Sequence, residues 1–138
     1  MPFRVALLRF VPLALFIASC TKKLSPQVRI VHPGDGDTLT ATEIQVVLQA
    51  QGVEIVPATE NRPGTGHHHL LLDVDVTPLD EKIPQGVTGI IHLGRGQSDF
   101  TFTDLAPGEH RLIAVVADGD HVPLKPPVVD TVRFVVRR

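Results

Sequence analysis

The sequence contains seven histidines, which are its main candidates for metal ligands. Three of them, His67, His68 and His69, are consecutive and directly follow a segment that ends at Gly66. In an extended strand, alternate side chains point to opposite faces, so His67 and His69 share one face and His68 lies on the other. Two imidazoles at positions i and i+2 of a strand can bind one metal ion, and neutral imidazole suits Zn²⁺, Cu²⁺ and Ni²⁺.

Further potential ligands follow at larger spacing. They are His92 and His121, with Asp118 and Asp120 as possible ligands, and His68 on the other strand face is a third possible ligand. Sulfur ligands are not expected, because the only methionine is the first residue and the only cysteine is Cys20. With nitrogen and oxygen donors alone, the sequence favours Zn²⁺ or Cu²⁺, with Ni²⁺ as a further option, over a sulfur site for Cu⁺.

A structural interpretation of the same residues stays open. His68 would then be a half-buried core residue, and His67 and His69 would hydrogen-bond to carbonyl groups of the glycine-rich turn. The segment Asp118-Gly119-Asp120 fits an ordinary tight turn as well as an oxygen site for Ca²⁺. No serine lies in a nucleophile elbow, and the sequence places no carboxylate pair in a defined cleft, so we predict no catalytic residues.

Composition limits the size and the partners of the protein. Its 138 residues have a mass of 15.0 kDa, which is room for one domain. The absence of Trp and Tyr and the net charge of −2 argue against nucleic-acid binding, because stacked bases need aromatic side chains and phosphates need positive charge. With one cysteine, the chain forms no disulfide within itself and must be held by its core.

The first 19 residues are typical of a secretory signal peptide. Arg4 and Arg9 give the start of the chain a positive charge, and a short apolar run over 10–17 follows. The sequence Ile17-Ala18-Ser19-Cys20 resembles the lipobox of bacterial lipoproteins, whose cysteine becomes the lipidated N-terminus. The resemblance implies that Cys20 carries a lipid anchor, that residues 20–26 form a tether, and that the mature protein is exported to the periplasm and held at the outer membrane.

Residues 27–138 alternate between apolar and polar side chains, as β-strands do. We expect one strand to continue through a bulge at Gly52 to Ile55, and another to run from His67 to Val76. Seven short strands separated by proline- and glycine-rich turns predict an all-β, antiparallel sandwich of the immunoglobulin or fibronectin-III type. A jelly roll or a small open barrel is the alternative. The expected strands are marked by Val28, Ile44, Leu70, Gly89, Phe100, Leu112 and Val132.

In an immunoglobulin-like sandwich, chain direction reverses at each turn, so alternate loops share one end. The third expected strand begins at His67, the fourth reaches His92 near its end, and the loop before the last strand contains His121. All three positions fall at the same end, and the third strand is flanked by the fourth and the sixth. We therefore predict that His67, His69, His92 and His121 converge.

Two other histidines fall at the opposite end of this topology. His32 precedes Pro33 at the end of the first strand and is expected in a turn or on the surface. The segment from Asp104 to Leu112 resembles the corner between the fifth and sixth strands of immunoglobulin-like domains. His110 stands where a tyrosine usually bonds back to the upstream backbone, so we predict a structural role for it.

Four motifs occur in a fixed order along the domain: Gly64-x-Gly66-His67-His68-His69-Leu70-Leu71-Leu72-Asp73, His92-Leu93-Gly94-x-Gly96-Gln97, Leu105-x-Pro107-Gly108-x-His110 and Asp118-x-Asp120-His121-Val122-Pro123. In these motifs the chain resembles a bacterial family of short exported domains of unknown function. The resemblance covers about residues 60–136. It implies a small exported or lipid-anchored protein and supplies no reaction.

These observations predict a lipid-anchored periplasmic sandwich that binds a divalent transition metal or a small ligand at its histidine end. Its role would be that of a carrier or accessory module. The alternative is a non-catalytic protein–protein interaction module of the cell envelope, in which the histidines are structural.

Overall fold

The computed structural model describes residues 23–76 and 78–138, and within them the chain forms nine strands and no helix. The expected signal peptide and the lipidated Cys20 lie outside the described residues. The strands are β1 (Gln27–His32), β2 (Thr38–Leu39), β3 (Glu43–Gln51), β4 (Glu54–Ile55), β5 (Thr65–Leu72), β6 (Ile90–Leu93), β7 (Asp99–Thr103), β8 (Gly108–Ala117) and β9 (Val129–Val136).

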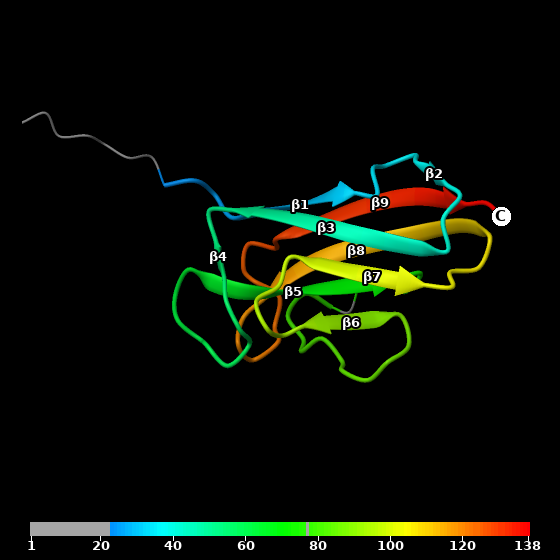
Figure 1. The fold of residues 1–138 in the computed structure, drawn as a ribbon. Coiled ribbons are helices and arrows are strands. Elements are labelled where there is room, and N and C mark those ends of the chain that lie inside the picture. Colours follow the sequence, from blue (N-terminus) through cyan, green and yellow to red (C-terminus); the bar gives the residue numbers. More distant parts are fainter. Residues whose placement is uncertain (1–22, 77) are drawn as a thin grey trace, which may run out of the picture.

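The strands form two sheets that pack face to face (Figure 1). The smaller sheet has the order β1-β3-β7, and the larger has the order β2-β9-β8-β5-β4, with β6 also paired to β5. The long strands pair antiparallel, and only the two-residue strands β2 and β4 pair in parallel. This strand order is that of an immunoglobulin- or fibronectin-III-like sandwich, so the fold class predicted from the sequence is confirmed.

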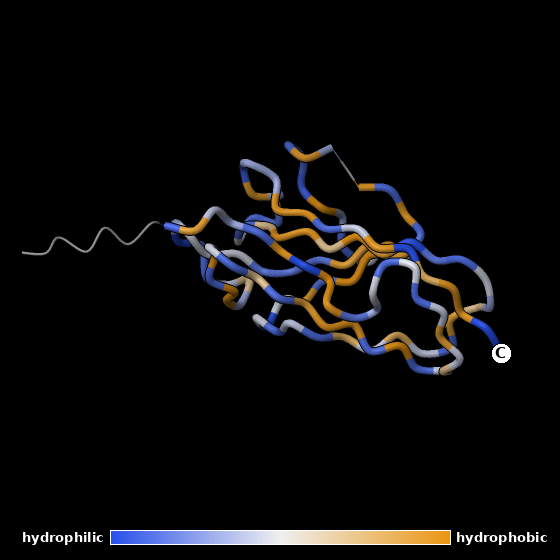
Figure 2. Tube along the Cα trace, turned by 90° about the horizontal axis from the view of Figure 1, so that it is seen from above, coloured by the Kyte–Doolittle hydropathy of each residue, from blue (hydrophilic) through white to orange (hydrophobic). Residues whose placement is uncertain are grey.

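The main core lies between the two sheets and follows from the alternation of apolar residues. Ile44, Val46 and Leu48 of β3 face Leu70 of β5 and Phe134 of β9, and all five are buried. Figure 2 shows the same alternation as orange and blue segments along the strands. Burying one such side chain contributes about 1.5–3 kcal/mol, and this burial holds a domain that has no disulfide.

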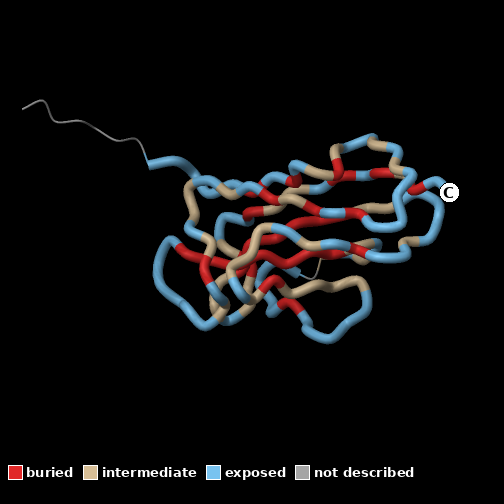
Figure 3. The backbone as a smooth tube through the Cα atoms, viewed as in Figure 1, coloured by how far each residue is buried: buried red, intermediate tan, exposed pale blue. Residues whose placement is uncertain are grey.

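A second, smaller cluster covers the outer face of the larger sheet. Leu71 of β5 packs there with Ile113 and Val115 of β8, under Ile83 from the long loop between β5 and β6. Strand β5 is therefore buried on both faces, which Figure 3 shows as a red stretch through the middle of the molecule. The covering loop is what encloses the outer face near the histidines.

The structure corrects two expected strand boundaries. Gly52 does not form a bulge within one strand, because the chain turns there with a φ of 67° and crosses to the other sheet, where β4 pairs with β5. The strand that begins near His67 ends at Leu72 and not at Val76. Asp73 then takes a φ of 57°, and the residues beyond it pack on the outer face of the sheet.

Candidate metal centre

Four imidazole rings gather at one end of the larger sheet, on its outer face. They belong to His67 and His69 of β5, His92 of β6 and His121 of the loop between β8 and β9. The six distances between their ring centres run from 4.7 Å to 5.6 Å. The convergence predicted from strand order is therefore present in the structure, and we call these residues the four-histidine cluster.

Sheet pairing positions three of the four rings. His67 and His69 are two residues apart on β5 and therefore share its outer face. His69 lies directly opposite His92 in the antiparallel pair of β5 and β6. The ring of His92 therefore lies on the same outer face as the ring of His69. The side chain of His92 also needs Gly94, because a Cβ there would lie 2.3 Å from its Cε1.

The fourth ring is held by a tight loop. His121 has a φ of 69°, a conformation that few residues other than glycine adopt. One carboxylate oxygen of Asp118 accepts hydrogen bonds from the backbone N–H groups of Asp120 (2.9 Å) and Val122 (3.0 Å). The carbonyl of His121 also accepts a bond from the N–H of Ile83, at 2.9 Å. These bonds fix the loop over the open end of β5.

The cluster has a buried side and a more accessible side. His67 and His69 are 1% and 0% exposed, whereas His92 and His121 are only partly buried. Solvent therefore reaches the cluster on the side of His92 and His121.

The ring nitrogens show an incomplete hydrogen-bond pattern. His121 Nδ1 lies 3.2 Å from the carbonyl oxygen of Gly119, which accepts only, so Nδ1 carries a hydrogen and donates it. The Nε2 atoms of His67 and His69 are 3.0 Å apart. Two buried nitrogens, His69 Nδ1 and His92 Nε2, have no partner among the described residues. An unpaired buried polar atom costs about 1–3 kcal/mol, so hydrogen bonding alone explains this cluster poorly.

Three of the four imidazoles, those of His67, His69 and His92, are favoured in the neutral form. Burial lowers the pKa of His67 to about 4 and that of His69 to about 3, with a further lowering by the neighbouring histidines. Burial, followed by repulsion from His121, also lowers the pKa of His92. Two positive rings about 5 Å apart would repel each other by about 3 kcal/mol in a partly polar surrounding. Neutral imidazole is the form that binds a transition metal.

The donor set fits a transition-metal ion. One nitrogen from each of His67, His92 and His121 lies within 4.8 Å of the others, and His69 stands beside His67. Metal–imidazole bonds are about 2.0–2.1 Å, so small side-chain movements would bring these nitrogens onto one ion. The bond that His121 Nδ1–H donates to a carbonyl is the kind of interaction that orients a ligating histidine.

The other candidate ligands do not belong to this group of rings. His68 is fully buried on the inner face of β5, and neither of its nitrogens has a partner among the described residues. The carboxylate of Asp118 is engaged by its own turn, and that of Asp120 accepts a bond from Asn61 Nδ2 at 3.1 Å. These aspartates stabilise the loop that carries His121.

His110 lies at the opposite end, in the corner position predicted for it. Its Nε2 bonds to the carbonyl of Ala106, four residues upstream, at 2.8 Å, and its Nδ1 bonds to Asp73 Oδ2 at 2.7 Å. Both partners only accept, so both nitrogens must donate and the ring is a cation. Burial lowers the pKa of His110, but these two hydrogen bonds outweigh it and raise the pKa above its usual value. His32 lies at the end of β1, away from the cluster.

Sequence reasoning missed several residues that shape the site. Gly94 makes room for the ring of His92, and Ile83 covers the sheet beside His121. The signal for Gly94 was its place in the second family motif, two residues after His92. Ile83 gave no signal, because it lies in a polar loop without alternation.

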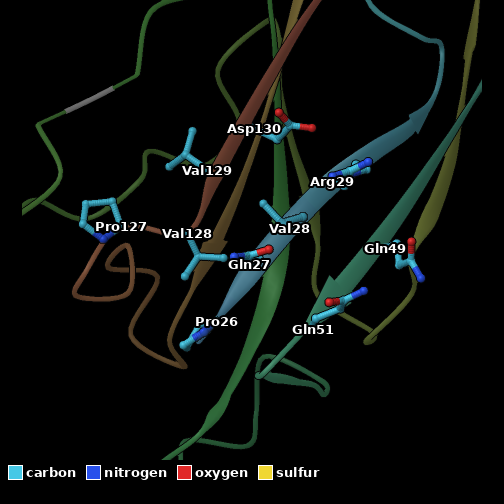
Figure 4. Close-up of a pocket in the computed structure, with 10 residues that line it drawn as sticks. All are labelled: Pro26, Gln27, Val28, Arg29, Gln49, Gln51, Pro127, Val128, Val129 and Asp130. Atoms are coloured by element: carbon cyan, nitrogen blue, oxygen red, sulfur yellow. The ribbon is translucent and has the colours of Figure 1, made fainter. Parts of the chain in front are cut away.

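A hollow of about 450 Å³ lies elsewhere, between β1 and the start of β9 (Figure 4). Its lining includes Arg29, Gln49 and Asp130, and none of the seven histidines. It is therefore separate from the four-histidine cluster.

Fold and site together define an immunoglobulin-like β-sandwich with a four-histidine cluster on the outer face of its larger sheet. The chain belongs to the family described as domain of unknown function DUF4399, whose model matches residues 46–137. That range contains all four cluster histidines. No curated protein matches the sequence.

Several solved structures share the fold. An engineered protein matches 85% of this chain with a TM-score of 0.52 and 10% sequence identity. The endo-β-1,4-mannanase from Thermotoga petrophila matches 87% of this chain with a TM-score of 0.51 and 12% sequence identity. This chain spans 21% of the length of each. Fibronectin(III)-like modules of Clostridium thermocellum CbhA match with a TM-score of 0.48 and 13% identity, over 80% of this chain and 97% of theirs. Within residues 23–76 and 78–138, no helix has the length and apolar character needed to cross a membrane.

Proposed function

We propose that this protein binds a divalent transition-metal ion at His67, His69, His92 and His121, and that it serves as a carrier or accessory module without a catalytic role. The observation that carries the proposal is the gathering of four imidazoles whose ring centres lie within 5.6 Å of one another. One buried nitrogen of the cluster, His92 Nε2, has no hydrogen-bond partner among the described residues, and a metal ion would supply one.

We also propose that the protein acts in the cell envelope, anchored to the outer membrane by a lipid on Cys20. The support is the sequence before the fold, where a short apolar run leads to Ile17-Ala18-Ser19-Cys20. The first strand begins at Gln27, so a short tether separates the anchor from the sandwich.

The second candidate function is a protein–protein interaction module with structural histidines. Strand β7 favours it, because it pairs with β3 alone within its sheet and leaves one edge without a paired strand among the described residues. An open strand edge can accept a strand from a partner protein.

Calorimetric titration of the purified protein with Zn²⁺, Cu²⁺ and Ni²⁺ tests the first proposal. We expect one ion per chain at micromolar or tighter Kd, with binding lost in the double variant His67→Ala/His69→Ala. Because that variant removes two buried rings, the partly exposed His92→Ala provides a second test in a chain that keeps its core. His32→Ala, at the other end of the domain, is the matched control and should bind like the wild type. No binding by the wild type would reject the metal proposal and favour the interaction module.

A further inference from the structure

The arrangement of the four rings also indicates a preferred coordination geometry. We infer that the cluster is built as a closed tetrahedral site of four imidazoles, with His69 as the fourth ligand, and that it is suited to Zn²⁺. This inference rests on the proposed function, because it assumes that the cluster binds a metal.

The ring centres lie at the corners of a tetrahedron and not of a square. Four equal ligands at the corners of a square have two diagonal distances that are about 1.4 times the side, whereas all six distances in a regular tetrahedron are equal. Here the longest separation, between His69 and His121, is 5.6 Å, and the shortest, between His92 and His121, is 4.7 Å. Their ratio is about 1.2, and the other four pairs fall between 4.8 Å and 5.0 Å.

The size of this tetrahedron fits one ion. With metal–nitrogen bonds of about 2.0–2.1 Å, tetrahedral ligation places ligand nitrogens about 3.3 Å apart and imidazole ring centres about 5 Å apart. The observed ring centres match this spacing. The Nε2 atoms of His67 and His69 are 3.0 Å apart, so His69 already stands at the distance of a second ligand on the same ion.

The sheet keeps the site from flattening. His67, His69 and His92 lie on two paired strands, and His69 is directly opposite His92 in the register. A square-planar arrangement would require one of these rings to move past its neighbour on a buried sheet face. Cu²⁺ and Ni²⁺ prefer tetragonal geometry and would lose part of their advantage for imidazole here, whereas Zn²⁺ accepts a tetrahedron without penalty.

Closure by a fourth protein ligand has a functional meaning. Catalytic zinc sites keep a position open for water, and sites that only hold the ion are filled by four side chains. With His69 in place, all four positions come from the protein. The closed site therefore agrees with a holding role and not with hydrolysis.

Substitution with Co²⁺ tests the geometry, because four-coordinate Co²⁺ absorbs visible light much more strongly than six-coordinate Co²⁺. We expect the purified wild-type protein to take one Co²⁺ per chain with strong visible absorption, which one equivalent of Zn²⁺ then abolishes. Binding with weak absorption would overturn the tetrahedral inference and leave the proposed function standing. No uptake of Co²⁺ or Zn²⁺ would reject the proposed function itself.

The variant His69→Gln tests the fourth ligand, with circular dichroism to confirm that it folds. We expect retained but about 10- to 100-fold weaker Zn²⁺ binding and a weaker Co²⁺ spectrum, because water would enter the vacated position. An unchanged Co²⁺ spectrum and Zn²⁺ affinity in the folded variant would show that His69 is not a ligand. The wild-type Co²⁺ spectrum decides the geometry even if this variant does not fold.

Discussion

Acidification should destabilise the metal-free protein at a pH where its carboxylates are still ionised. Burial lowers the pKa of His67 and His68 to about 4 and that of His69 to about 3. In the unfolded chain each returns to about 6.5. Between about pH 4 and 6.5 the unfolded state thus binds more protons than the folded state, so stability falls as the pH falls.

The expected loss is large compared with the stability of a small domain. Lowering the pH from 7 to 5 costs about 2 kcal/mol for each of the three buried histidines, or roughly 6 kcal/mol together. Domains of this kind are stable by about 5–15 kcal/mol, so this loss is a large part of the free energy of unfolding of the metal-free protein.

Urea unfolding of the chelator-treated protein between pH 8 and pH 5 measures this loss. Far-ultraviolet circular dichroism is the suitable signal, because the chain has no Trp or Tyr. His68→Leu removes one of the three groups and should remove about a third of the pH dependence. A free energy of unfolding that stays constant from pH 7 to pH 5 would refute the reasoning, because the three rings would then be no more buried than in the unfolded chain.

Three further predictions concern single positions. The methyl group of Gly94→Ala would clash with the ring of His92 and should weaken metal binding, measured by calorimetry, by about 10- to 100-fold. Gly34→Ala, away from the cluster, is the control and should bind the metal like the wild type. Equal affinities of the two variants would contradict the role of Gly94. His68→Leu removes two unpartnered buried nitrogens and should raise the free energy of unfolding at pH 7 by about 1–3 kcal/mol without affecting metal binding; a loss of stability would mean that His68 is hydrogen-bonded in solution. The His110–Asp73 pair stabilises the fold fully below about pH 6.5, and this stabilisation is lost as the pH rises through the raised pKa of His110. Asp73→Asn should therefore lower the free energy of unfolding by about 1–3 kcal/mol at pH 6 and by less at pH 9. A loss that does not depend on pH would exclude a charged His110 ring.

Local pattern and strand order were enough to predict much of the site. The alternation of β5 placed His67 and His69 on one face and His68 on the other. The order of strands in an immunoglobulin-like sandwich then brought His92 and His121 to the same end. Both steps use properties that every strand and every such topology share, so they do not depend on loop conformation.

The parts that sequence could not predict depend on loops and on distant contacts. The turn at Gly52 sends the chain to the other sheet, although the residues on both sides alternate like one strand. The partner of His110 is Asp73, 37 residues earlier, which joins it only because β5 and β8 are paired. The cover supplied by Ile83 comes from a loop whose path no local periodicity encodes.

The four cluster histidines come from segments that are far apart along the chain, so a metal ion bound to them would stabilise the fold. A metal ion bound there would tie β5, β6 and the loop before β9 together, and would close chain loops of about 25 and 29 residues, as a disulfide does in many secreted domains. By the loop-entropy relation used for disulfides, closing a loop of about 25 residues removes unfolded-state freedom worth roughly 3–4 kcal/mol. A chain with a single cysteine would thus have a reversible cross-link made of histidines, and its resistance to proteases would depend on the supply of metal around it.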